Sequence, residues 1–185
     1  VEFGTNPEGR LSRFMSYCVG LRLNKGLVFM SDTRTNAGVD NVSMFRKMFS
    51  WERPGERVIT LLTAGNLATT QAVVSLLEER SKAPGDRDPD ILAAPSMFQV
   101  AKLVGETLTE VIGSHGTSGQ KADSPFAASL IVGGQIQGGE PRLFLVYPEG
   151  NFIEASGDTR FFQIGETKYG KPIIIRAYNP YMSFE

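Results

Sequence analysis

Several side chains that could build a nucleophilic site fall within the first fifty residues of this 185-residue chain. Ser16 opens a strand-like run, and Asp32 and Arg34 follow in the segment Ser31-Asp32-Thr33-Arg34-Thr35. Lys47 stands among apolar neighbours in Met44-Phe45-Arg46-Lys47-Met48-Phe49, which indicates a lysine that is drawn inward. A hydroxyl beside charged groups can act as a nucleophile when a neighbouring base takes its proton. The elements that carry these residues must therefore bring them together.

The register of the first predicted hairpin decides how these groups lie. Two β-rich runs, 16–23 and 27–34, flank the turn signal Asn24-Lys25-Gly26. A three-residue turn places Leu23 opposite Leu27 and Ser16 opposite Arg34, with Asp32 on the same face and roughly 5–7 Å from Ser16. A two-residue turn would shift this register by one. The alternatives are an edge hairpin with a surface Asp-x-Arg pair and a Lys47 whose ammonium reaches water.

The sequence contains few residues that could support other kinds of nucleophilic or metal chemistry. The only cysteine is Cys18 and the only histidine is His115, so a His/Cys zinc site, Ser-His catalysis and Cys-His catalysis are disfavoured. Cys18 shares a strand face with Ser16 and is a rival nucleophile, although a small buried residue is the simpler interpretation. His115 lies among glycine and serine residues and is predicted to be in a loop. We expect neither a metal nor a cofactor.

A glycine turn precedes the first predicted helix. Thr63-Ala64-Gly65-Asn66 follows a second strand pair, 45–51 and 57–63. Glycine permits close backbone approach, and a helix N-terminus offers N–H groups to an anion, although a plain glycine turn is the alternative. The predicted buried face of this helix comprises Ala68, Ala72, Leu76 and Leu77.

The remaining elements complete an α+β pattern. A second helix is predicted from the cap Ser96 to about Gly113. Its apolar face comprises Met97, Ala101, Val104, Leu108, Val111 and Ile112. Strands are predicted at 127–135, 142–147, 151–155 and 161–164, and 167–178 is ambiguous because Pro172 fits only the first turn of a helix. Strands, two adjacent helices and further strands predict helices that cover a largely antiparallel sheet.

Composition indicates one ordinary globular domain. Hydrophobic residues make up 41% and charged residues 21% of the chain, and the net charge of -1 gives no reason to expect nucleic acid or an anionic membrane as partner. No apolar run approaches the ~18 residues of a membrane span. A single cysteine fits a reducing, cytoplasmic location. We expect residues 1–15 to be a leader, a propeptide or an added segment, and 16–185 to be the domain.

Three segments resemble the catalytic frame of proteasome β-type subunits. The first is Ser31-Asp32-Thr33-Arg34-Thr35, which resembles their Asp-x-Arg segment, and the second is Arg46-Lys47-Met48, which resembles the strand of their catalytic lysine. The third, Ala64-Gly65-Asn66-Leu67-Ala68-Thr69-Thr70-Gln71-Ala72-Val73, resembles their oxyanion turn and first helix. The stretch from Met15 to about Ala83 is most similar to the bacterial Anbu branch.

Two features depart from the family pattern. Ile164-Gly165-Glu166-Thr167 stands where proteasome subunits carry a Gly-Ser-Gly turn. The family's later Asp and Ser would lie beyond Glu185. Because Ser183-Phe184-Glu185 is typical of a helix start, we expect the chain to be truncated there.

The resemblance implies an N-terminal-nucleophile (Ntn) hydrolase fold, an αββα sandwich with helices on the outer faces. It implies that Ser16 becomes the nucleophile after removal of residues up to Met15, with its own α-amine as base. Lys47 would then lower the pKa of that amine, Asp32 would anchor Lys47, and Arg34 would hold Asp32. The implied oxyanion donor is Gly65 N–H, and the implied substrate-binding residues are Thr35, Arg46 and Thr63.

The resemblance also implies a homo-oligomer, either a closed ring or an open helical assembly, that acts on a peptide or amide substrate. Two alternatives remain at this point. One is a catalytically silent subunit that retains the frame without turnover, and the other is a small-molecule amidase with the same site.

Overall fold

The computed structural model describes residues 16–36, 42–82, 90–115 and 126–183. The expected leader at 1–15 and the last two residues lie outside this part. The elements are β1 (Tyr17–Leu23), β2 (Gly26–Ser31), β3 (Arg34–Asn36), β4 (Val42–Met44), β5 (Met48–Arg53), β6 (Arg57–Gly65), α1 (Leu67–Lys82), α2 (Met97–His115), β7 (Ala128–Ile136), β8 (Arg142–Val146), β9 (Phe152–Glu154), β10 (Phe161–Gly165) and α3 (Gly170–Ala177).

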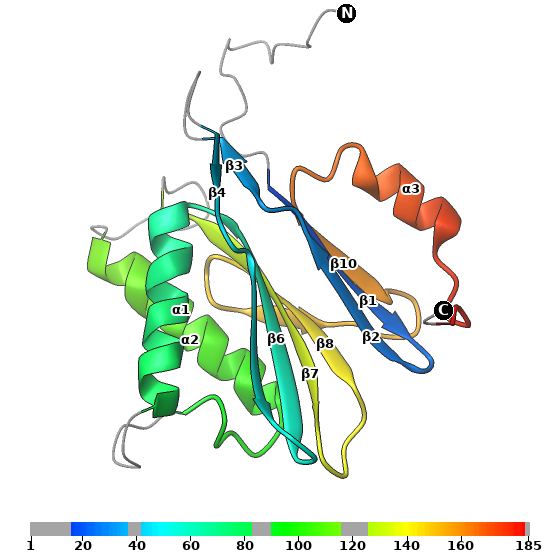
Figure 1. Ribbon diagram of the computed structural model, residues 1–185, viewed down its shortest axis with the longest axis horizontal. Coiled ribbons are helices and arrows are strands. Elements are labelled where there is room, and N and C mark those ends of the chain that lie inside the picture. Colours follow the sequence, from blue (N-terminus) through cyan, green and yellow to red (C-terminus); the bar gives the residue numbers. More distant parts are fainter. Residues whose placement is uncertain (1–15, 37–41, 83–89, 116–125, 184–185) are drawn as a thin grey trace, which may run out of the picture.

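The elements stack in four layers. Strands β5-β6-β7-β8-β9 form an antiparallel sheet, and β10-β1-β2 form a second one. Helices α1 and α2 cover the outer face of the first sheet, the two sheets pack face to face, and α3 lies on the far side of the second sheet (Figure 1). The predicted α+β sandwich with helices on its outer faces is confirmed.

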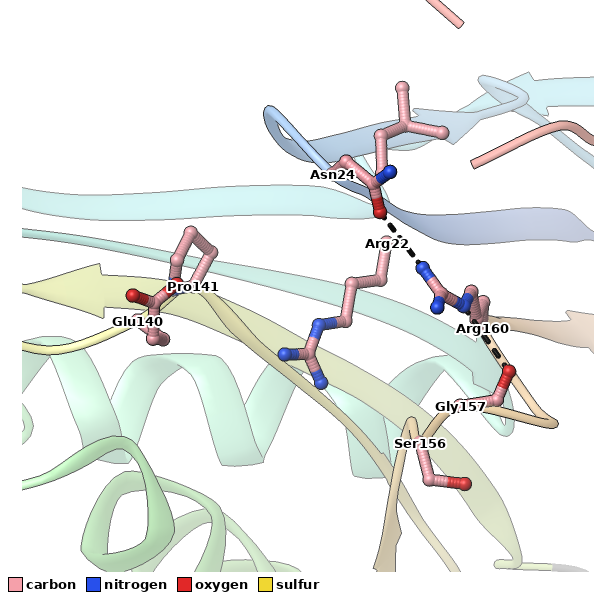
Figure 2. Close-up of a pocket in the computed structure, with 8 residues that line it drawn as sticks. Arg22, Asn24, Glu140, Pro141, Ser156, Gly157 and Arg160 are labelled. Atoms are coloured by element: carbon pink, nitrogen blue, oxygen red, sulfur yellow. Dashed lines mark hydrogen bonds between the residues drawn. The ribbon is translucent and has the colours of Figure 1, made fainter. Parts of the chain in front are cut away.

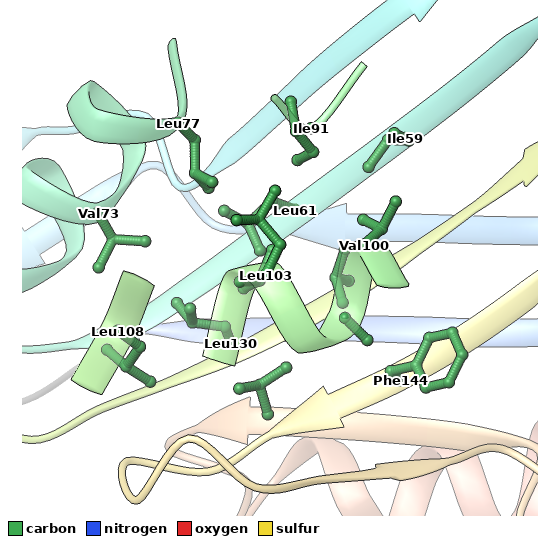
Figure 3. Packing of buried hydrophobic residues seen from close by; sticks show 14 of the residues in the cluster. Ile59, Leu61, Val73, Leu77, Ile91, Val100, Leu103, Leu108, Leu130 and Phe144 are labelled. Atoms are coloured by element: carbon green, nitrogen blue, oxygen red, sulfur yellow. The ribbon is translucent and has the colours of Figure 1, made fainter. Parts of the chain in front are cut away.

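The larger core lies between the two long helices and the five-stranded sheet. Side chains from α1, α2, β6, β7 and β8 meet there, as Figure 3 shows. Every residue of the predicted apolar face of α2 is buried. The predicted face of α1 is wrong for Ala68, which is exposed. The fully packed positions of α1 are Thr69, Thr70, Val73, Val74 and Leu77.

A smaller apolar layer separates the two sheets. It contains Cys18, Leu62, Ala64, Ile131, Leu143, Ala155, Phe162 and Ile164. The sheets approach closely at Gly20, because a Cβ there would meet the side chains of Ile131 and Leu143 at 3.0 Å. The middle of the interface is therefore apolar and tightly packed, and polar residues occur at its two ends.

The first hairpin has a shorter turn than expected. Leu23 pairs with Gly26 rather than with Leu27, so the turn contains only Asn24 and Lys25. Gly26 adopts a φ of 147° and joins the strand instead of the turn. The expected register is therefore wrong by one residue, and Asp32 lies opposite Tyr17, whose carbonyl accepts a hydrogen bond from Asp32 N at 3.0 Å.

Three further segments differ from the expectation or resolve it. Lys47 precedes β5 rather than lying inside a strand, because β3 and β4 form a separate two-stranded pair before it. His115 is the last residue of α2 and not part of a loop. The ambiguous segment forms α3, with Pro172 in its first turn. Among the helices of the described residues, none combines the length and apolar character needed to cross a membrane.

Candidate active site

Asp32 connects a buried lysine to the backbone beside Ser16. The Lys47 ammonium donates to Asp32 Oδ1 at 2.8 Å, and Tyr17 N donates to the same oxygen at 3.0 Å. Only 5% of the Lys47 side chain is exposed, against 31% for Asp32. A buried ammonium is costly unless it is paired and hydrogen-bonded, so this carboxylate fixes the lysine at the start of β1. Because β2 ends at Ser31, strand alternation does not dictate where the Asp32 side chain points.

The peptide group that follows Ser16 is held on both sides. Its N–H is bound by Asp32, and its carbonyl, that of Ser16, accepts a hydrogen bond from Glu166 N at 2.7 Å. Gly165 permits this approach because it has a φ of 85° and a Cβ there would collide with the Ser16 carbonyl. Ser16 itself is 7% exposed. Its position is therefore set by two separate segments of the chain.

Gly65 forms a tight turn between β6 and α1. Its φ is 115°, and a Cβ would lie 2.6 Å from the carbonyl oxygen of Ala127. The next residue, Asn66, caps α1, because its Oδ1 accepts a hydrogen bond from Thr69 N at 3.0 Å. The end of β6, where Gly65 lies, and the first turn of α1 are at the same end of the sandwich as the start of β1, as Figure 1 shows.

The alternation of the β6 ladder orients the Gly65 N–H. Asn66 N donates to Ala127 O on the β7 side, whereas Thr63 N donates to Lys47 O on the β5 side, at 3.0 and 2.9 Å. Successive N–H groups of a strand point to opposite sides, so Gly65 N–H points to the side on which Lys47 lies. Strand β5 begins only at Met48, whose partner is Leu62. The Gly65 N–H therefore points past the end of that ladder.

The rival nucleophile Cys18 lies in an unreactive environment. Its side chain is fully buried between the sheets, and its Sγ donates to Thr63 O at 3.5 Å. Burial, followed by the nearby Asp32 charge, raises the pKa of Cys18 from 9.0 to about 12. A thiol of this kind stays protonated at neutral pH and is a poor nucleophile.

The predicted substrate-binding residues differ in burial, and the side chain of Thr35 lies outside the described part of the chain. Thr63 is buried and its backbone contacts both Lys47 and Cys18. Arg46 is exposed; its Nε donates to Met48 O and its guanidinium lies 5.2 Å from the centre of the Phe49 ring. The backbones of Arg34 and Thr35 form β3, paired with β4, while their side chains lie outside the described part of the chain.

Sequence reasoning did not assign one supporting contact. The Gly165-Glu166 turn departs from the family pattern, in which Glu166 or Thr167 would have to replace a serine side chain, yet it holds the Ser16 carbonyl through the Glu166 backbone. The Glu166 side chain turns away and accepts a hydrogen bond from Lys168 N at 3.1 Å. The available signal in the sequence was Gly165, which directly follows the predicted strand 161–164 in the segment that departs from the family pattern.

Comparison with solved structures finds several similar proteins in one group. An Anbu (ancestral beta-subunit) protein from Yersinia bercovieri superimposes with a TM-score of 0.82 at 50% identity, over 90% of this chain and 68% of that one. Anbu from Hyphomicrobium sp. strain MC1 gives 0.79 at 50% identity, over 90% and 68%. The helical assembly of the Anbu complex from Pseudomonas aeruginosa gives 0.81 at 46% identity, over 90% and 68%. A scan against protein-family models and a search of curated proteins each found no match.

Proposed function

Because the chain belongs to the Anbu family of proteasome-type subunits, we propose that it hydrolyses amide bonds with Ser16 as an N-terminal nucleophile. The observation that carries this proposal is the link from Lys47 through Asp32 to the peptide group of Ser16, at 2.8 and 3.0 Å. A buried ammonium held beside the start of β1 has a direct use if Ser16, the residue before that strand, carries a free α-amine. Like-charge repulsion would then favour the neutral amine, which is the form that acts as a base.

The proposed reaction needs no group beyond this frame and a water molecule. Ser16 Oγ attacks the carbonyl carbon of the amide and forms a C–O bond, while its proton passes to the α-amine of Ser16. Gly65 N–H binds the oxyanion, a contact that is typically worth about 2.7–4 kcal/mol in the transition state. The C–N bond then breaks as the leaving nitrogen takes the proton, and water hydrolyses the acyl-serine ester. Arg34 is proposed to hold Asp32, and Thr35, Arg46 and Thr63 to contact the substrate.

This mechanism requires cleavage of the chain before Ser16. While Met15 is attached, the nitrogen of Ser16 is an amide and cannot accept a proton. We therefore propose that residues 1–15 are removed before the enzyme becomes active. Measuring the intact mass of the protein, purified from a host in which its natural processing can occur, tests this step directly. A mass that begins at Ser16 is the expected result, and a mass that retains Met15 contradicts it.

Covalent labelling tests the nucleophile. A peptide epoxyketone is expected to add once to protein that begins at Ser16, and peptide mapping should place the adduct on Ser16. Ser16→Ala should abolish the label, whereas the matched variant Cys18→Ala should retain it, because that thiol is buried and protonated. Labelling that persists in Ser16→Ala would place the nucleophile elsewhere.

A second candidate is a catalytically silent assembly subunit. It is favoured by one observation, the Gly165-Glu166-Thr167 turn, which replaces the family's serine turn. Protein of the correct mass that takes up no label would support this candidate. Neither outcome would separate a peptidase from a small-molecule amidase, and competition between peptide and small amide substrates is the experiment for that choice.

We further propose that the protein forms a homo-oligomer. The Pseudomonas aeruginosa relative is described as a helical assembly. A heterologous interface gives a closed ring or an open helix depending on its rotation. Light scattering that finds only monomer across a concentration series would contradict this proposal.

A further inference from the structure

The interface between the two sheets ends, far from Ser16, in two directly opposed arginines. Leu21 pairs with Phe161, and Arg22 N donates to Arg160 O at 2.7 Å, so Arg22 and Arg160 are cross-strand neighbours. Each lies two residues from a position that packs between the sheets, since Gly20 and Phe162 both do so. Side chains two residues apart share a strand face. Arg22 lies six residue steps along the chain from Ser16, a distance of roughly 20 Å in a strand.

Neutral acceptors hold both guanidinium groups. Arg22 Nη1 donates to Ala155 O at 2.9 Å. Arg160 Nη1 donates to Asn24 Oδ1 at 3.0 Å, and its Nε donates to Gly157 O at 3.2 Å, as Figure 2 shows. These contacts orient the two arginines without neutralising either charge.

The carboxylate that interacts electrostatically with Arg22 is Glu154, whose pKa is lowered chiefly by its hydrogen bonds to Arg142 and to a smaller extent by the charge of Arg22. Both oxygens of Glu154 are bound by Arg142, at 2.7 and 2.5 Å. Within the part of the chain that the structure describes, neither Arg22 nor Arg160 forms an ion pair with any carboxylate. Like charges placed directly opposite each other on paired strands are destabilising. An anion between them would remove that cost.

A cavity of about 310 Å³ lies at these two arginines. Its walls include Glu140 and Pro141, between β7 and β8, and Ser156, before β10, and Figure 2 shows Arg22 extending between these two segments. The charged residues in its lining are two arginines and one glutamate, a net charge of +1. The volume is near the lower end for small-molecule sites.

We propose that this cavity binds a small oxyanion, such as inorganic phosphate or a small carboxylic acid, between Arg22 and Arg160. Guanidinium groups present paired N–H donors that match the oxygen atoms of phosphate and carboxylate. The bond from Arg22 to Ala155 and those from Arg160 to Asn24 and Gly157 fix the donors in advance, so binding orders few side chains. The site is independent of Ser16 and of the proposed hydrolase activity.

Thermal unfolding in phosphate and in chloride at equal ionic strength tests the proposal. At ten times the dissociation constant, phosphate should raise the unfolding midpoint by about 3–6 °C above the value in chloride. The proposal would be overturned if the unfolding midpoints were equal in the two salts, up to the highest phosphate concentration whose ionic strength can be matched with chloride.

Variants locate the effect. Arg22→Gln and Arg160→Gln should each lose the additional phosphate shift, whereas Lys82→Gln, which removes one exposed positive charge at the end of α1, should keep it. The midpoint of each variant in chloride shows whether it folds. Isothermal titration of the wild-type protein with phosphate gives a second, variant-free measurement, and absence of saturable heat would also overturn the proposal. A phosphate shift that survives both arginine variants would place the anion elsewhere.

Discussion

The two ends of the sheet–sheet interface carry positive charge in opposite ways. At one end, Lys47 is almost fully buried and its ammonium is paired with Asp32 at 2.8 Å. At the other, Arg22 and Arg160 face each other across paired strands and their guanidinium groups are held by neutral acceptors. A buried cation needs a permanent partner, whereas a cation in an open cavity can take an exchangeable one. The first arrangement suits a fixed catalytic frame and the second suits ligand binding.

The apolar layer between the sheets separates these ends. Leu62, Ile131, Leu143 and Phe162 fill the middle of the interface and are all buried. The ends are roughly 20 Å apart, which exceeds the Debye length of about 8 Å at physiological salt. Changes at one end should therefore add to changes at the other without coupling. The following predictions test this contrast, beginning with the largest effect.

Loss of the lysine should eliminate the proposed chemistry. Lys47→Ala removes the ammonium bound to Asp32, so hydrolysis of a peptide substrate should fall by about 10²–10⁴-fold, a typical range for a lost acid–base contribution. The unfolding free energy should also fall by about 1.5–3 kcal/mol, since a charge-assisted hydrogen bond is lost. Turnover assays and urea titration measure the two effects. The control Lys82→Ala should change neither, and turnover that survives Lys47→Ala would exclude the proposed mechanism.

A methyl group at Gly165 should disturb the support of Ser16. Gly165 and Gly55 both have positive φ, at 85° and 77°, so alanine at either position should cost about 1–2 kcal/mol in backbone strain. Only at Gly165 does the new Cβ also collide with the Ser16 carbonyl, while nothing lies within 4 Å of it at Gly55. Gly165→Ala should therefore be the more destabilising in urea titration. If both variants lost the same unfolding free energy, the contact between residue 165 and the Ser16 carbonyl would have relaxed without cost.

Deprotonation of Cys18 should weaken the middle layer at high pH. Burial raises the pKa of this thiol from 9.0 to about 12, so the folded state keeps a proton that the unfolded state loses. The resulting stability is complete below pH 9 and is lost as pH rises toward 12, at up to about 1.4 kcal/mol per pH unit. Urea titrations on both sides of the ordinary thiol pKa measure this slope. Cys18→Ala should flatten it, and an unchanged slope would assign the titration to another group.

The sequence allowed much of the site to be predicted because its residues lie in local motifs. Asp32, Lys47 and Gly65 could be proposed from a short charged segment, an apolar context and a glycine turn, and the structure brings Asp32 and Lys47 together. The hairpin register could not be predicted, because one residue of turn length depends on whether Gly26 joins the strand. The error did not separate Asp32 from Lys47, since Asp32 lies beyond the end of β2.

Features that depend on distant pairing were less predictable. The layered fold follows from the order of helices and strands, but the α1 face was misplaced because two threonines, Thr69 and Thr70, occupy buried positions there. The pairing of Arg22 with Arg160 joins residues 138 positions apart and leaves no local signal in either segment. Only the antiparallel register of β1 and β10 places the two charges in one cavity.

The smallest effect should come from the arginine end. In a phosphate-free buffer, raising NaCl from about 0.02 M to 0.5 M should stabilise the wild-type protein more than Arg160→Gln, because salt screens the repulsion between Arg22 and Arg160. The difference should be a few tenths of a kcal/mol, up to about 1 kcal/mol, as for like charges opposed across strands. Urea titrations at the two salt concentrations measure it, with Lys82→Gln as the control of equal charge. The same salt step should leave the cost of Lys47→Ala nearly unchanged, because a buried pair is poorly screened. If both ends responded equally to salt, the contrast between the ion pair at Lys47 and the opposed positive charges at Arg22 and Arg160 would be wrong.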